Sequence, residues 1–146
     1  MSKALAQGVR ALEQGEVPVG AVIVENSSGN ILASTHNLVE STNDATCHAE
    51  ILAIKAASKK LSSKNLSSCD IYITLEPCTM CASAISHAKI ARVFYGASDI
   101  KGGAVENGVR FFTRETCHHR PEVYPGIMAK ESTDLLLEFF KNLRQG

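Results

Sequence analysis

The sequence predicts an α/β fold with three layers, α-β-α, in which helices cover both faces of a mixed sheet. Two apolar runs at residues 17–25 and 31–35 flank the turn-forming segment Asn-Ser-Ser-Gly-Asn, which is typical of an antiparallel hairpin. From residue 48 onward, helical and extended patterns alternate, which indicates parallel strands connected by helices. A hairpin joined to such a unit gives a sheet of mixed direction.

The first two elements follow from periodicity and glycine placement. Apolar residues recur at helical spacing over residues 2–14, and Gly15 is placed to end that helix. The nearly continuous β-branched run at 17–25 predicts a strand buried on both faces, in which Gly20 lets another backbone approach closely.

The remaining elements alternate in type along the chain. A polar loop (37–46) and a serine-rich linker (62–68) flank the second helix, and a glycine-rich polar loop precedes the last strand. The predicted helices are 48–61, 79–87 and 132–143, and the predicted strands are 71–74, 91–95 and 122–124. Together with the hairpin, this gives five strands.

Composition bounds the class of protein. A chain of 146 residues is long enough for one domain, 1–146, with its own core. No apolar run approaches the ~20 residues that cross a bilayer, and the N-terminus is too polar for a secretory signal, so we expect a cytoplasmic protein and no membrane partner. Five cysteines, two of them in a C-x-x-C, favour metal or redox chemistry over a disulfide framework.

The charge balance excludes a globally basic surface for nucleic acid. Fifteen basic and fifteen acidic residues cancel. An RNA partner would therefore need a local basic cluster, for which the sequence offers His118, His119, Arg120, Lys141 and Arg144.

Two segments carry residues suited to metal chemistry. Cys78 and Cys81 stand at i and i+3 where a helix is predicted to begin, so both can bind one ion, and the helix N-terminus favours their thiolates. His48 can supply a third ligand. Glu50 lies only two residues further on, so we expect His48 at the first position of its helix for both side chains to reach the site.

Two thiolates and a neutral imidazole would hold Zn²⁺ and leave a fourth position for water, the pattern of catalytic sites. Zinc lowers the pKa of such a water from about 15.7 toward ~7, and Glu50 would take that proton and pass it to a leaving group. H-x-E followed by P-C-x-x-C is the known signature of zinc-dependent nucleobase deaminases. Glu76, just before the metal turn, is interpreted as structural.

A non-enzymatic interpretation stays open at this point. A C-x-x-C can also be a redox pair or half of a structural zinc knuckle. A closed site with four protein ligands would make the chain a zinc-binding module, and four residues could complete it: His36, Cys47, Cys69 and His87.

Motifs over nearly the whole chain resemble the bacterial tRNA-specific adenosine deaminases. They are Gly15-Glu16-Val17-Pro18-Val19-Gly20-Ala21, His48-Ala49-Glu50, Thr74-Leu75-Glu76-Pro77-Cys78-Thr79-Met80-Cys81 and Val93-Phe94-Tyr95-Gly96-Ala97. The resemblance implies a cytidine-deaminase-like fold with a five-stranded sheet, conversion of adenosine to inosine at the anticodon wobble position of tRNA, and a homodimer with one Zn²⁺ per subunit.

The resemblance also implies roles for single residues. It makes His48, Cys78 and Cys81 the zinc ligands and Glu50 the proton shuttle. Six further residues would bind the substrate: Asn37, which hydrogen-bonds the flipped base, Ala49, Asp99 and Lys101 in a loop that meets the anticodon, and Phe140 and Arg144 in the final helix.

The chain departs from this pattern at residues 105–117 and at His118, where the family usually has asparagine. An alternative activity within the same superfamily is deamination of a free base or nucleoside, guanine or cytosine. Such enzymes share the zinc motifs and usually close their pocket with the C-terminal segment.

Overall fold

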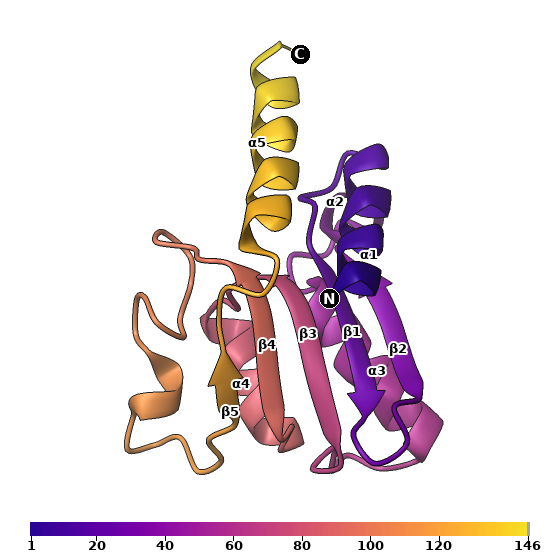
Figure 1. Cartoon of the computed structure of the whole chain (residues 1–146), viewed down its shortest axis with the longest axis vertical. Coiled ribbons are helices and arrows are strands. Elements are labelled where there is room, and N and C mark those ends of the chain that lie inside the picture. Colours follow the sequence, from indigo (N-terminus) through magenta and orange to yellow (C-terminus); the bar gives the residue numbers. More distant parts are fainter. Residues whose placement is uncertain (146) are drawn as a thin grey trace.

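The structure, a computed structural model that describes residues 1–145, contains a five-stranded sheet with helices on both faces, as predicted (Figure 1). The strands are β1 (Gly20–Glu25), β2 (Ile31–His36), β3 (Cys69–Leu75), β4 (Arg92–Ala97) and β5 (Glu122–Tyr124). The helices are α1 (Ser2–Glu13), α2 (Val39–Thr42), α3 (Ala49–Leu61), α4 (Thr79–Ala88), the 3-10 turn η1 (Phe111–Thr113) and α5 (Ala129–Gln145). Within residues 1–145, no helix combines the length and apolar character needed to span a bilayer.

The strand order β2-β1-β3-β4-β5 and the strand directions bring the carboxyl ends of four strands to one edge of the sheet. β1 is antiparallel to both β2 and β3, whereas β3, β4 and β5 run parallel. The carboxyl ends of β2, β3, β4 and β5 therefore share an edge, where Asn37, Glu76 and Ser98 directly follow the first three of these strands. Ligands of open α/β sheets bind beyond such carboxyl ends.

In Figure 1, α3 and α4 lie behind the sheet, whereas α1 and α5 start on the other side at its upper end and extend beyond it. Ala21 and Ile23 of β1 belong to the core cluster that includes Ala53 of α3 and Ile85 of α4. Burial on both faces explains why β1 is apolar almost throughout rather than alternating.

Glycines allow α1 and α5 to lie directly on the sheet. A Cβ on Gly20 would stand 1.9 Å from the carbonyl oxygen of Ala4 in α1. A Cβ on Gly96 of β4 would stand 2.4 Å from Ser132 Oγ in α5. The close approach expected at Gly20 is thus confirmed, and β4 contains a second one.

Some predicted boundaries were wrong. β1 begins at Gly20 and not at residue 17, because Val19 N–H bonds the carbonyl of Val17 in a tight turn. The predicted loop 37–46 contains α2, which is too short to show a helical period. α5 begins at Ala129, three residues before the apolar periodicity that revealed it.

Candidate active site

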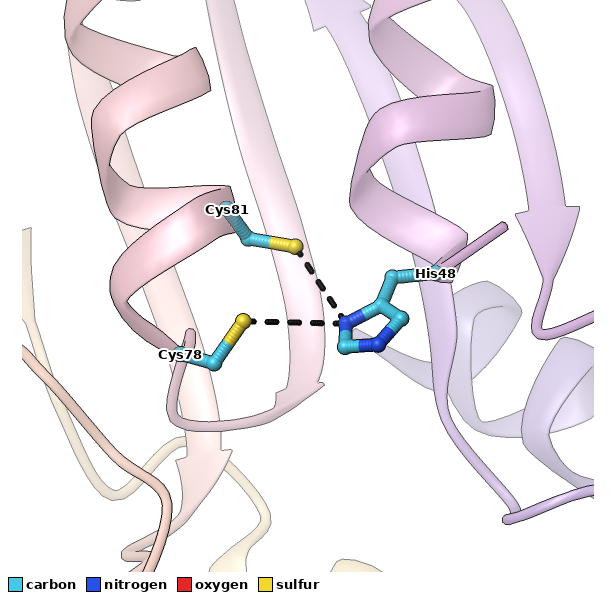
Figure 2. A group of neighbouring side chains, drawn as sticks. All are labelled: His48, Cys78 and Cys81. Carbon is cyan, nitrogen blue, oxygen red and sulfur yellow. Dashed lines mark hydrogen bonds between the residues drawn. The ribbon is translucent and has the colours of Figure 1, made fainter. Parts of the chain in front are cut away.

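Three side chains that can bind a metal meet where α3 and α4 begin (Figure 2). His48 is the N-cap of α3, with an extended backbone, and Cys78 is the N-cap of α4. Cys81 lies in the first turn of α4. The placement of His48 just before α3, rather than inside it, lets both His48 and Glu50 face the site.

The spacing of these atoms fits a tetrahedral zinc ion. His48 Nδ1 lies 3.6 Å from Cys78 Sγ and 3.5 Å from Cys81 Sγ. Zinc bonds of about 2.0 Å to nitrogen and 2.3 Å to sulfur at tetrahedral angles place such ligands ~3.5 Å apart. Of all His, Cys, Asp and Glu side chains in residues 1–145, only these three form such a group, so no fourth protein ligand closes the site.

The two thiols differ in their affinity for protons. The hydrogen bond from Cys81 and the neighbouring His48 ring lower the pKa of Cys78 to about 4. The hydrogen bond to Cys78 and burial raise the pKa of Cys81. A lowered thiol pKa favours the thiolate, which is the form of cysteine that binds metal.

Glu50 lies in the first turn of α3 and is 4% exposed. It belongs to no metal-ligand group but lines the same cavity as His48 and Cys78. Burial raises the pKa of Glu50 to about 6. A carboxyl group of that pKa can both accept and release a proton near neutral pH.

Asn37 is held in one orientation by the start of α3. Its side-chain oxygen Oδ1 accepts the backbone N–H of Ala49 at 2.8 Å. Thr35 Oγ1 donates to the carbonyl of Ala49 at 2.7 Å and fixes the same turn. With Oδ1 engaged, the Nδ2 donor is the group that Asn37 presents to the cavity it lines.

These residues open onto a cavity of about 740 Å³ beyond the carboxyl ends of the strands. Its polar lining comes from strand ends and helix starts, and α5 contributes Phe139 and Leu143. Ala49 and Cys81 are fully buried and do not line the cavity. Ala49 acts on the site through its backbone.

A second hollow of about 770 Å³ adjoins the first, between α5 and residues 98–101. Lys101, Phe140 and Arg144 line it, and Asp99 lines both cavities. Phe140 is 47% exposed, whereas the neighbouring Phe139 is buried. The structure therefore brings four of the six residues predicted to bind the substrate to this hollow, namely Asp99, Lys101, Phe140 and Arg144, whereas Asn37 and Phe139 line the first cavity.

The basic cluster expected from the sequence is not formed. His119 donates through Nε2 to the carbonyl of Ile90, just before β4, and so lies at the opposite edge of the sheet. Lys141 and Arg144 lie near the end of α5, beyond the carboxyl ends of the strands. Because β4 and β5 are parallel, the segment entering β5 cannot reach the edge at which the cavity opens.

Sequence reasoning missed Glu16, a buried carboxylate in the cavity wall. It accepts hydrogen bonds from the backbone N–H groups of Glu40 (2.9 Å) and Ser41 (2.7 Å) and from Ser41 Oγ (2.5 Å). Burial alone would raise the pKa of Glu16, but these bonds lower it below its ordinary value. The sequence did offer two signals: Glu16 stands between a helix stop and an apolar run, and it belongs to one of the motifs that carry the family resemblance.

Residues 1–97 match the zinc-binding region of cytidine and deoxycytidylate deaminases. The chain belongs to this deaminase family. Among its relatives, the tRNA-specific adenosine deaminase of Rickettsia typhi is 54% identical over 99% of this chain and 97% of its own length. The deaminase therefore matches that relative from end to end, beyond the zinc-binding region alone.

Solved structures agree with this placement. One, from a study of A-to-I editing by tRNA:A34 deaminases at the wobble position of transfer RNA, superposes with a TM-score of 0.90 at 51% identity and covers 93% of the deaminase and 97% of that chain. The guanine deaminase of Bacillus subtilis gives a TM-score of 0.65 at 31% identity, covering 99% of the deaminase and 91% of that chain.

Proposed function

We propose that this deaminase hydrolyses adenosine to inosine at the anticodon wobble position of tRNA, with one Zn²⁺ per subunit. One observation carries the proposal. A metal-ligand group, a buried carboxyl and an oriented amide donor open onto one cavity, and a second hollow with cationic and aromatic residues adjoins it. The names of the relatives point to the same substrate.

The net reaction consumes water and adenosine and yields inosine and ammonia. Zinc bound by His48, Cys78 and Cys81 would lower the pKa of a coordinated water to near 7, which supplies a nucleophile at neutral pH. Glu50 would accept a proton from the attacking water and deliver it to the amino nitrogen that leaves C6 as ammonia. Its raised pKa, about 6, suits both transfers.

Asn37 orients the base. Its Nδ2 donor faces an acceptor, such as a purine ring nitrogen, while Oδ1 stays bound to Ala49 N–H. Asn37→Ala should cut turnover and leave the zinc content unchanged, because Asn37 lies outside the ligand group. Steady-state kinetics and metal analysis of the variant check both parts.

The second hollow suits the nucleotides beside the flipped one. Phe140 offers a ring for stacking, and Lys101 and Arg144 offer charges for phosphates. Asp99 lines both cavities and would accept a hydrogen bond from the neighbouring ribose hydroxyl, which DNA lacks. An adenosine in a loop is partly unstacked, so flipping it costs less than flipping one in a duplex.

We further propose a single cytoplasmic domain, residues 1–146, that works as a homodimer. Net charge is zero, so a monomer has little long-range attraction for RNA, and a second subunit enlarges the contact surface. Light scattering coupled to gel filtration measures the mass directly. A monomer at micromolar concentration that still deaminates tRNA would contradict the dimer.

The deciding experiment compares inosine formation in an anticodon stem-loop with ammonia release from free adenosine, cytosine and guanine. We expect the stem-loop to react fastest and the same sequence in a duplex to stay nearly unreacted. Faster turnover of a free base would overturn the proposal.

The second candidate is a guanine deaminase. Phe139 and Leu143 of the C-terminal helix line the zinc cavity, as a segment closing a free-base pocket would. The 31% identity to the guanine deaminase of Bacillus subtilis points in the same direction. Ammonia release from guanine in the assay above tests it.

A further inference from the structure

Glu76 connects the metal turn to the loop that follows β4, residues 98–107. It lies between the end of β3 and the N-cap Cys78, and it is 2% exposed. Its carboxylate accepts six hydrogen bonds from the 98–107 loop. Oε1 accepts from Ser98 Oγ (3.3 Å), Asp99 N–H (3.0 Å) and Asn107 Nδ2 (2.7 Å). Oε2 accepts from the N–H groups of Val105 (3.1 Å), Glu106 (3.0 Å) and Asn107 (3.1 Å).

The 98–107 loop is also shaped to receive this carboxylate. A Cβ on Gly103 would stand 2.5 Å from Glu76 Cδ and 2.4 Å from the carbonyl oxygen of Asp99. The next residue, Ala104, donates its N–H to the carbonyl of Pro77 at 2.8 Å. The loop therefore binds both Glu76 and the residue after it, directly before the metal ligand Cys78.

This hydrogen bonding argues against a proton-transfer role for Glu76. Each carboxylate oxygen already accepts three donors, so no oxygen is left to take a proton from a substrate. Glu50, by contrast, has neither oxygen committed to a comparable set of backbone donors, and burial raises its pKa. The two glutamates in the cavity wall thus have different tasks.

We propose that Glu76 is a positioning residue, which fixes the 98–107 loop to the metal turn so that Asp99 and Gly102 stand at the cavity wall at a set distance from the reacting centre. Both loop residues line the zinc cavity. The loop is aligned by six donors on one buried charge, and hydrogen bonds to charged groups are among the strongest in proteins. The effect on catalysis rests on the proposed tRNA function; the effect on the loop does not.

The proposal predicts a particular kinetic change. A wall that contacts the substrate equally in the ground and transition states contributes to KM and not to kcat. Glu76→Gln keeps the shape of the side chain but replaces one acceptor oxygen with an NH₂ group, which meets N–H donors in either orientation. We expect KM for the stem-loop to rise about tenfold, with kcat within about threefold of wild type.

The experiment measures two readouts on zinc-loaded Glu76→Gln: stem-loop kinetics, and hydrogen exchange of the amides of Val105, Glu106 and Asn107. We expect faster exchange at these amides and an unchanged zinc content. Hydrogen exchange needs no substrate. It therefore tests the contact between Glu76 and the 98–107 loop even if the proposed tRNA substrate is incorrect. Glu16→Gln is the matched control, since it should speed exchange at Glu40 and Ser41 and leave the amides of 105–107 unchanged.

Gly103→Ala tests the same contact without altering the carboxylate, and serves if Glu76→Gln fails to fold. Its Cβ should push the loop off Glu76 and raise both KM and amide exchange while zinc is retained. Unchanged exchange at 105–107 in both variants would overturn the proposal. So would a kcat loss above a hundredfold with KM and exchange unchanged, which would make Glu76 a proton carrier.

Discussion

The inner site and its outer rim are built on different principles. His48, Glu50, Cys78 and Cys81 stand in the first turns of α3 and α4, whose buried faces are fixed by the sheet. The rim, formed by α5 and residues 98–101, exposes its apolar groups: Ile100 is 83% exposed and Leu143 60%.

The difference separates chemistry from recognition. Side chains that transfer protons or bind metal must be held in position to within a fraction of an ångström. The first turns of helices that follow buried strands hold them in this way. A surface that contacts a flexible polynucleotide needs area, rings and charges, which an exposed helix can supply. Substitutions in the inner site should therefore change zinc content or turnover, whereas substitutions in the rim should change KM for the RNA substrate.

The largest effect should come from Cys81→Ser. The hydroxyl is a poor zinc ligand, so bound zinc should fall from one per chain to near zero, with no measurable turnover and an unfolding free energy lower by about 4 kcal/mol or more. Metal analysis and thermal unfolding measure this. Cys47→Ser is the control, because Cys47 lies outside the ligand group and should keep the zinc. Full activity of the metal-free protein would contradict the assignment of the inner site as a zinc-dependent catalytic centre.

The second largest effect should come from Glu50→Gln. Glutamine keeps the shape and the hydrogen bonding but cannot carry a proton, so turnover should fall by about 10²–10⁴-fold. Zinc content and thermal midpoint should match wild type, since Glu50 binds no metal in the ligand group. Substantial residual turnover would show that another group accepts the proton.

Phe140→Ala probes the rim. Loss of one stacking ring should raise KM for the stem-loop about tenfold, with kcat and thermal stability unchanged. Leu137→Ala is the matched control: it is also on α5 and 60% exposed, but lines neither cavity. Equal effects of both substitutions would mean that α5 acts through its general surface and not through the hollow.

The smallest effect should come from Glu16→Gln, measured as stability against pH. The pKa of Glu16 is lower in the folded protein than its ordinary 4.5, so the ionised group stabilises the fold above that value and the contribution is lost as pH falls below it. At pH 7 we expect the variant to be less stable by about 1–2 kcal/mol. The difference should shrink below about pH 4.5; a constant difference would contradict the ionic origin of the contact.

The sequence pattern predicted those features of the fold and site that depend on residues close together in the chain. The apolar run of β1, the helical periods of α3 and α4, and the metal motifs each depend on residues close in the chain, and the structure contains each of these features, although β1 starts three residues later than predicted. The hydrogen bonds of Glu16 and Glu76 join residues 22 or more positions apart, and the periodicity of neither segment predicts them.

The errors have the same origin. α2 has four residues, and the N–H groups of Glu40 and Ser41 in it donate to the distant side chain of Glu16, which stabilises the helix. The expected basic cluster combined His118–Arg120 with the end of α5 because both are cationic, without regard to the direction of β5. Strand direction decides which loops share an edge, and no single segment encodes it.

The contact between Gly96 and Ser132 has a further consequence. Phe139 and Leu143 form part of the cavity lining and ride on α5, and α5 lies on β4 at a residue with no side chain. An added carbon at Gly96 would overlap with Ser132, so α5 would have to move away from β4 and carry Leu143 with it. The position of Phe139 and Leu143 in the cavity lining thus depends on a contact between Gly96 and Ser132, neither of which lines either cavity.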